Sequence, residues 1–180
     1  RTDPGFSRDA AARILQEQLR AHPDWLGISS NWEPDAFDGR DSAFIDAEGH
    51  DASGRFMAYW SWQNGTLVRE VLRDYDTPGV GDWYLKSRNT HVANVMEPYL
   101  YPVAGVETLM TTLSTPIMED ERFLGTVNVT LALDALQARI SQLRPLGVGN
   151  ASLLSPAGAV MASVDASEIG KVRDAADTRK

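Results

Sequence analysis

The sequence predicts an α+β domain built on one antiparallel, meandering sheet, and three observations lead to that fold class. Residues 7–22 carry apolar side chains at helical spacing. Residues 55–63 alternate with period two and precede Asn64-Gly65, a strong hairpin signal. Further strand-like segments then follow one another instead of alternating with helices, which favours neighbouring antiparallel strands over βαβ units.

The first predicted element is an amphipathic helix over residues 7–22. Ala11, Leu15 and Leu19 recur at i, i+4 and i+8 and form its apolar stripe. Ser7 suits the N-cap, and Pro23 ends the helix.

The sheet segments follow in chain order. Residues 26–32 read as a short strand, and residues 33–44 as a loop with a turn at Asp38-Gly39. The strand at 55–63 and the return strand after Asn64-Gly65 form a hairpin. Residues 79–92 predict a turn and a short helix with Asp82 as its N-cap. The next strands are predicted at 97–101, 108–118 and 122–133, with turns near Gly105 and at 119–121.

The C-terminal part returns to helical spacing. Residues 133–143 predict a helix that Pro145 and Gly147 close, and residues 151–164 predict a pair of short strands. The polar residues that follow suggest a second unit that this stretch of sequence does not complete.

Composition excludes several classes. The 180 residues are 43% hydrophobic and 23% charged, as in an ordinary globular domain. A net charge of -8 without any basic stripe argues against a nucleic-acid partner. There is no cysteine for disulfides or thiolate metal sites, and no apolar run near the roughly 20 residues of a membrane span. The opening residues RTDPGFSRDA are not expected to be a signal peptide.

No enzyme motif is present, so we expect no catalytic residue and no cofactor. His22, His50 and His91 are scattered, and zinc-protease, nucleophile-elbow, P-loop and dinucleotide-binding patterns are absent. The acidic residues at 33, 35, 38 and 41 suggest calcium, but their spacing does not match an EF-hand loop. A structural turn is the better interpretation, and we expect no metal site.

Aromatic residues are the main ligand-binding candidates. A small-molecule pocket needs apolar rings and a few polar groups, and rings beside carboxylates suit an amine through cation–π contact and charge. The same rings could instead be ordinary core, and the threonines could reflect strand propensity alone. The candidate ligand-binding residues are Trp60, Trp62, Tyr75, Asp82, Trp83, Tyr84, Glu97, Tyr99, Tyr101, Thr112 and Thr130.

Several stretches together resemble the double Cache sensor domains found outside the membrane in bacterial methyl-accepting chemotaxis proteins and related receptors. The matching segments are DWLGISSNWEPDAFDGRDS (24–42), SGRFMAYW (53–60), DYDTPGVGDWYLKSR (74–88), EPYLYPVAGVETLMTTLSTPI (97–117), FLGTVNVTLALDALQ (123–137) and NASLLSPAGAVMASVDASEIGK (150–171). The resemblance implies a PAS-like antiparallel sheet flanked by helices and a long N-terminal helix. It also implies three parts: that helix at 1–23, a complete membrane-distal module with the ligand pocket at 24–135, and a connecting helix with the start of a membrane-proximal module at 136–180.

The resemblance also bears on the ligand. In the amino-acid-binding branch, an arginine two positions before a Trp-Tyr pair grips the ligand carboxylate, and an aspartate on the last distal strand binds its ammonium. Those positions correspond to Gly81 and Thr130 here. A missing guanidinium removes about 1.5–3 kcal/mol per charged hydrogen bond, which argues against an amino acid.

The function expected from the resemblance is extracytoplasmic sensing in a membrane-anchored chemoreceptor of the inner membrane. Its partner would be an amine or a small polar or carboxylate compound, and a second copy would pack along the N-terminal helix. The alternatives are a ligand-free dimerisation module that senses through a periplasmic binding protein, or the sensor of a histidine kinase or cyclase.

Overall fold

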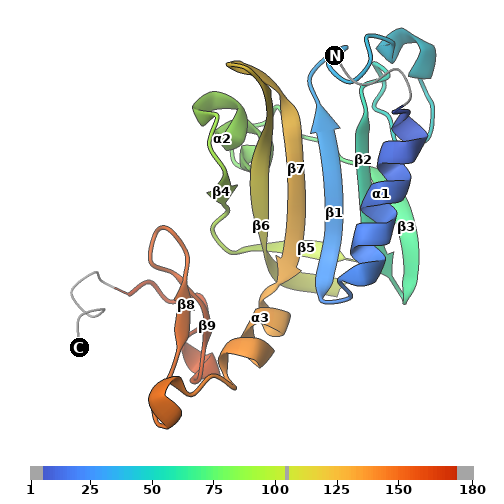
Figure 1. The fold of residues 1–180 in the computed structure, drawn as a ribbon. Coiled ribbons are helices and arrows are strands. Elements are labelled where there is room, and N and C mark those ends of the chain that lie inside the picture. The colour runs from blue at the N-terminus through green and yellow to red at the C-terminus, as the bar shows by residue number, and fades with distance from the viewer. Residues whose placement is uncertain (1–5, 104–105, 174–180) are drawn as a thin grey trace. The chain divides into compact units, whose positions relative to one another are not determined.

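The computed structural model describes residues 6–103 and 106–173 of the chain. The helices are α1 (Arg8–Ala21), α2 (Asp82–Thr90) and α3 (Leu133–Ile140), with short 3-10 turns at Asp41–Phe44, Pro145–Gly147 and Ala166–Glu168. The strands are β1 (Trp25–Trp32), β2 (Met57–Gln63), β3 (Thr66–Val71), β4 (Asn94–Val95), β5 (Tyr99–Val103), β6 (Val106–Glu119), β7 (Arg122–Ala132), β8 (Ser152–Leu154) and β9 (Val160–Ser163). The predicted α+β class with an antiparallel sheet flanked by helices is confirmed (Figure 1).

Helix α1 begins and ends where the sequence predicts. The Ser7 hydroxyl accepts a hydrogen bond from the Ala10 N–H at 3.1 Å, and the helix stops before Pro23. It is 14 residues long. Ala11, Ala12 and Leu19 are buried along one stripe, so packing against the sheet holds the helix in place.

The β2–β3 hairpin confirms the turn signal. Asn64 and Gly65 both have positive φ, 50° and 76°, as the favoured two-residue hairpin turn requires. Gln63 pairs with Thr66 directly across that turn, and the antiparallel register continues to Ala58 and Val71.

The strand order departs from a simple meander. It runs β3-β2-β1-β7-β6-β4 with β5 also pairing with β6, so β1 is central, between β2 and β7 (Figure 1). After β3 the chain passes through α2 to the opposite edge and then returns inward along β6 and β7. Local alternation predicted the strands, but it carries no information about this long-range pairing of β1 with β7.

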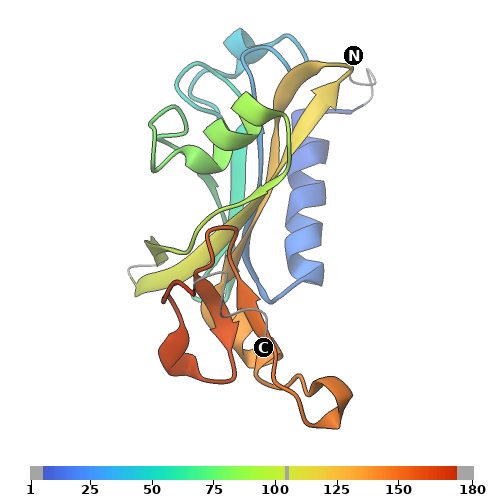
Figure 2. The ribbon, with the colours of Figure 1, turned by 90° about the vertical axis from the view of Figure 1, so that its left-hand side faces the viewer.

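The apolar core lies between α1 and one face of the sheet. Leu15 and Leu19 pack with Ile28 of β1 and Ala58 of β2, and Phe56 is completely buried beside them. Figure 2 shows α1 on this face and α2 on the other. One face of the sheet therefore packs its apolar side chains against α1, whereas the other face lies toward α2 and carries polar side chains.

Helix α2 starts one residue earlier than an Asp82 N-cap would allow, so that prediction is wrong. Gly81 is the N-cap, because its carbonyl already accepts the Leu85 N–H at 3.0 Å. Asp82 is the first helical residue, and its carboxylate accepts the Gly79 N–H at 2.9 Å. The carboxylate thus holds the turn that precedes the helix, and its negative charge lies at the helix start, where it is favourable.

The chain divides into two compact units, each described by itself. The first comprises residues 1–94 and 112–130, and the second comprises residues 95–111 and 131–180. The boundaries predicted at 23/24 and 135/136 stay a prediction.

Within the second unit, β8 and β9 form the predicted strand pair, and α3 ends at Ile140, three residues before the predicted end. Gln137 of α3 pairs with the backbone of β9, donating to the Ser163 carbonyl and accepting its N–H at 2.8 Å. Glu97 accepts hydrogen bonds from the Ser155 hydroxyl and the Ala157 N–H.

Candidate functional site

The sheet face opposite α1 is lined by uncharged polar side chains from four strands. Ser29 of β1 lies opposite Tyr59 of β2, whereas their neighbours Ile28 and Trp60 point to the α1 side. We call this surface the polar face. It comprises Ser29, Asn31, Tyr59, Ser61, Thr112, Ser114, Thr126, Asn128 and Thr130, and all of them except Tyr59 are buried.

Hydrogen bonds join these side chains across the strands. Asn31 donates to the Ser29 hydroxyl at 2.8 Å, and Asn128 donates to the same hydroxyl at 3.0 Å and to Thr126 at 3.1 Å. The hydroxyls of Thr112 and Thr130 lie 3.4 Å apart. A buried sheet face made of such groups is costly unless each group finds a partner.

Two amides on the polar face keep one end without a partner. The Oδ1 atoms of Asn31 and Asn128 are buried and accept no hydrogen bond. The two residues are 0% and 3% exposed, so bulk water does not supply the missing bond. An unsatisfied buried acceptor costs about 1–3 kcal/mol. Exchanging the oxygen and nitrogen of either side-chain amide by a 180° rotation would leave its NH2 unpaired instead. In both orientations, therefore, one polar atom of the amide lacks a partner at the same position.

Helix α2 is fixed over β6 by a small hydroxyl cluster. The Ser87 and Ser114 hydroxyls lie 3.0 Å apart, and Asn94 donates to Ser87 at 2.7 Å. The side-chain amide oxygen of Asn94 (Oδ1) is also buried without a partner. A third unpaired amide oxygen therefore lies where the chain leaves α2.

The other anchor of α2 is Tyr84, whose side chain is fully buried. Its hydroxyl donates to Glu33 and accepts from Arg55 at 3.0 Å. Burial and the Glu33 carboxylate raise the pKa of this hydroxyl far above its usual value. Arg88 reaches the same carboxylate at 3.2 Å.

Tyr75 and Asp51 extend this network. The Tyr75 hydroxyl donates to Asp51 at 2.6 Å, and the Arg55 guanidinium lies 4.7 Å from the Tyr75 ring centre. Burial and the Asp51 hydrogen bond raise the pKa of Tyr75 to about 12. Both tyrosines therefore stay neutral donors across the physiological range.

Two of the four acidic loop residues that suggested calcium, Asp38 and Asp41, bind Arg8. Arg8, at the first position of α1, donates to Asp38 at 2.6 and 3.1 Å, to Asp41 at 2.6 Å, and to the Gly54 carbonyl at 2.7 Å. Its guanidinium also lies 4.2 Å from the Phe44 ring centre. Across residues 6–103 and 106–173, His, Asp and Glu side chains form no group of three that could hold a metal ion.

The structure brings some of the sequence-predicted residues together. Thr112 and Thr130 are neighbours on the polar face. Tyr75, Trp83 and Tyr84 lie together around α2, with edge-to-face ring contacts of 5.9 and 5.8 Å to Tyr84. Asp82 lies at the start of that helix.

Other predicted residues lie elsewhere. Trp60 and Trp62 pack against the α1 core, on the sheet face opposite Thr112 and Thr130. Glu97, Tyr99 and Tyr101 belong to the second unit, where Tyr99 and Tyr101 point to one side of β5 and Tyr101 is 54% exposed.

The amides of Asn31 and Asn128 were missed, although the sequence carries a signal for them. In GTVNVT, polar residues alternate with Val127 and Val129, whereas ISSNW places three polar residues in a row between Ile28 and Trp32. Alternation of this kind usually marks a solvent-exposed face. Only the structure shows that this face is buried.

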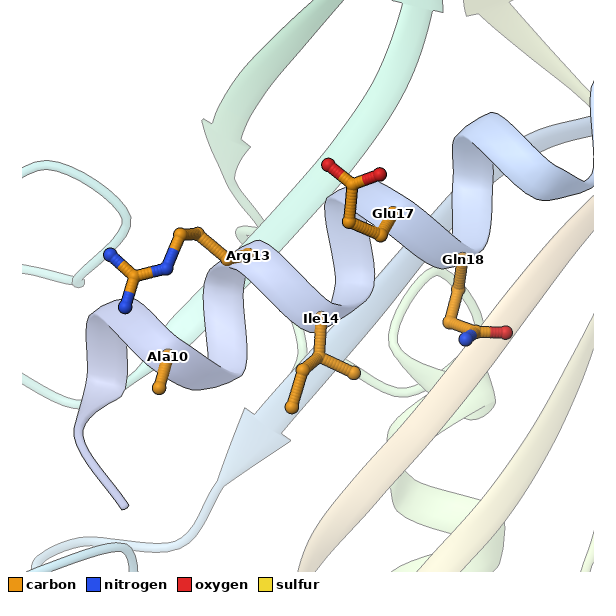
Figure 3. A pocket seen from close by; sticks show the side chains of 5 residues that line it. All are labelled: Ala10, Arg13, Ile14, Glu17 and Gln18. Carbon is orange, nitrogen blue, oxygen red and sulfur yellow. The ribbon is translucent and has the colours of Figure 1, made fainter. Parts of the chain in front are cut away.

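A separate hollow lies on the surface of α1 and is lined by Ala10, Arg13, Ile14, Glu17 and Gln18 (Figure 3). All five residues come from one helix, so the hollow lacks the convergent groups of a small-molecule site. Among the described residues, none of the helices is long and apolar enough to span a bilayer.

Comparisons with known proteins match most of the chain. The family model described as "Methyl-accepting chemotaxis protein-like, first PDC sensor domain" matches residues 12–138. The methyl-accepting chemotaxis protein TlpQ of Pseudomonas aeruginosa (strain PAO1) is 32% identical over an alignment that covers 91% of this chain and 25% of that protein.

Two solved structures extend the likeness to three dimensions. The extracellular domain of mmHK1S-Z3, described as a histidine kinase, is 32% identical with a TM-score of 0.75, and the match covers 97% of this chain and 62% of that one. Methyl-accepting chemotaxis protein X is 30% identical with a TM-score of 0.68, covering 94% and 62%. The chain thus spans a quarter of the curated relative and about three fifths of the solved domains.

Proposed function

Because this chain belongs to the family of methyl-accepting chemotaxis protein-like first PDC sensor domains, we propose that it is the periplasmic sensor of a membrane-anchored bacterial receptor and binds a small polar molecule directly. No covalent step is involved. Binding would favour one of two arrangements of the domain, and only a difference in affinity between them can drive a signal.

The observation that carries this proposal is the pair of unpaired amide oxygens on the polar face. Asn31 and Asn128 are buried, and the cost of their unsatisfied oxygens is recovered when a ligand supplies donors. A merely structural sheet face would gain stability from apolar residues at these positions. Retained, unsatisfied amides fit a binding surface better than a packing surface.

The ligand class follows from the same groups. Acceptor oxygens favour N–H donors, so a small amine is the first candidate. The register also places Glu70 of β3 opposite Tyr59, on the same face of the sheet, where its carboxylate can attract a cation. With the amides turned over, the site would instead suit a small carboxylate or another polar compound.

An amino-acid ligand is disfavoured because this chain has Gly81 where the amino-acid-binding branch has its carboxylate-binding arginine. The backbone around Gly81 also leaves no room for an arginine side chain. A Cβ at Gly81 would lie 2.5 Å from the Asp74 carbonyl oxygen and 2.6 Å from that of Tyr75. No side chain fits there unless the turn before α2 takes another path.

The test is a thermal-shift and calorimetry screen of amines, carboxylates and neutral polar compounds against the wild type and Asn128→Leu. A ligand at 100 times its Kd stabilises the wild type by about 2.7 kcal/mol, or about 5–11 °C for a chain of this size. We expect the shift to be absent in Asn128→Leu and retained in the control Asn89→Ala, whose side chain is exposed on α2. If no compound moves the wild-type melting temperature, direct sensing is wrong, and sensing through a binding protein replaces it.

We further propose that the receptor is a homodimer that packs along α1. Ile14 is 51% exposed on this helix, and Arg13 and Glu17 flank it in the hollow (Figure 3). In a two-fold dimer, Arg13 of each copy can meet Glu17 of the other. Sedimentation of wild type and Ile14→Lys tests this: equal self-association of the two proteins would contradict it.

The output is proposed to be chemotactic, since the matching family model and TlpQ are of that type. A histidine kinase is the second candidate, because a domain described as such has the higher TM-score of the two solved structures compared above. Fusing the chain to each kind of output module and measuring ligand-dependent kinase control would separate them.

A further inference from the structure

Two helices on opposite faces of the sheet contact one and the same connecting segment. The bridging segment, residues 33–55, runs from the end of β1 to the start of β2. Helix α1 packs on the apolar face, whereas α2 lies on the polar face (Figure 2). Side chains of both helices form hydrogen bonds with residues of this segment.

The contact with α2 involves both ends of the bridging segment. Glu33, its first residue, accepts the Tyr84 hydroxyl and the Arg88 guanidinium. Arg55, its last residue, donates to Tyr84 at 3.0 Å and to the Trp32 carbonyl at 2.9 Å. A displacement of α2 therefore pulls on both ends of the segment at once.

The contact with α1 involves the middle of the segment and Gly54, the residue before its last one. Arg8 is 2% exposed and binds Asp38, Asp41 and the Gly54 carbonyl. Because Arg8 is the first residue of α1, these bonds fix the beginning of that helix to the segment.

Internal bonds make the segment stiff between the two contacts. Asp41 accepts the Asp35 N–H at 2.6 Å while Asp35 accepts the Asp41 N–H at 3.1 Å. Asp51 accepts the N–H groups of Ser53 and Arg55 at 2.8 and 3.0 Å. At Gly54, a Cβ would lie 1.9 Å from the Asp41 carbonyl oxygen, so the two parts of the segment are in direct backbone contact.

We propose that the bridging segment couples α2 to α1, so that occupancy of the polar face is transmitted around the edge of the sheet to the first turn of α1. This inference rests on the proposed function for its ligand, but the coupling itself is a property of the unliganded protein. The coupling is reciprocal: loosening either helix loosens the other.

Hydrogen exchange of the unliganded protein tests the coupling. Tyr84→Phe removes the hydroxyl that Glu33 and Arg55 share and leaves the ring in place. We expect the amides of Ala11 and Ala12 in α1 to exchange at least about 5-fold faster, the lower end of typical coupling. Ser87→Ala is the matched control, because the Ser87 hydroxyl joins α2 to Ser114 of β6 and to Val92 and Asn94, none of which belongs to the bridging segment. Conversely, Arg8→Met should speed exchange at Tyr84 and Leu85.

Faster exchange confined to α2 and the segment in Tyr84→Phe would overturn the proposal, as would an equal response of α1 to Ser87→Ala. If Tyr84→Phe lowers the stability so far that β2 amides exchange equally fast, Arg88→Gln decides by the same criterion. That variant removes only a half-exposed partner of Glu33. A failed ligand screen leaves this result unaffected, so the two proposals can fail separately.

Discussion

Replacing Arg8 with methionine keeps the aliphatic length of the side chain and deletes its charge. The guanidinium is 2% exposed and neutralises Asp41, whose side chain is 9% exposed, and Asp38, which is 21% exposed. Removing one partner of a buried ion pair costs about 3–5 kcal/mol, because the other charge remains unpaired. Asp38 can be partly hydrated, so we expect about 3 kcal/mol, which corresponds to a decrease in Tm of roughly 6–12 °C.

Urea unfolding followed by tryptophan fluorescence measures this loss directly. Arg20→Met is the matched control, since Arg20 lies exposed on the same helix and its exposed pair with Glu17 contributes little, so its replacement should stay within about 0.5 kcal/mol. Adding Asp38→Asn and Asp41→Asn to Arg8→Met should restore part of the stability, because no unpaired charge then remains. A loss below about 1 kcal/mol, or no recovery in the triple variant, would refute the reasoning.

Three further predictions concern other parts of the chain. Gly81→Ala should destabilise the domain by about 1–3 kcal/mol in urea unfolding, because its Cβ would overlap the carbonyl oxygens of the preceding turn; an unchanged midpoint would contradict the tight approach. Stability should fall on acidification in two steps. Burial lowers the pKa of His50, so its contribution is lost as the pH falls below about 6.5. Burial raises the pKa of the Asp38 and Asp51 carboxyls, but several opposing causes together outweigh it and hold both pKa values below the usual range. These are the hydrogen bonds and charges of Arg8 and Arg40 at Asp38, and the hydrogen bonds from Tyr75, Ser53 and Arg55 at Asp51. Their contribution is therefore lost below about pH 4. Urea midpoints between pH 2.5 and 8 check both steps, and a profile flat to pH 3 would argue against them. Gln137→Ala should speed amide exchange in β9 with little effect in β2, because the amide pairs with the β9 backbone; equal protection of β9 in both proteins would exclude this role.

Local elements could be predicted from the sequence because their signals are local. Ser7 and Pro23 bracket α1, and Asn64-Gly65 sets the β2–β3 turn by backbone conformation alone. The pairing of β1 with β7 could not be predicted, since it joins residues about a hundred positions apart, as the Asn128–Ser29 bond shows.

The candidate site was predictable only in part, for a related reason. Thr112 and Thr130 were identified, and the structure places them together. Trp60 and Trp62 were chosen for their chemistry, but alternation gives a residue's face only relative to its neighbours and does not say which face α2 covers. Asn31 and Asn128 were not identified, because the burial of this face depends on long-range strand pairing that the local sequence does not show.

The crowding around Gly81 has a consequence for how binding preference can change in this lineage. The carbonyl oxygens of three preceding residues, at 2.5 to 2.8 Å from any added Cβ, enclose that position. A single Gly81→Arg substitution is therefore not enough to give this domain an arginine that binds a carboxylate at this position. The path of the turn at residues 74–80 has to be remodelled first, so the main chain decides whether any side chain can occupy this position at all.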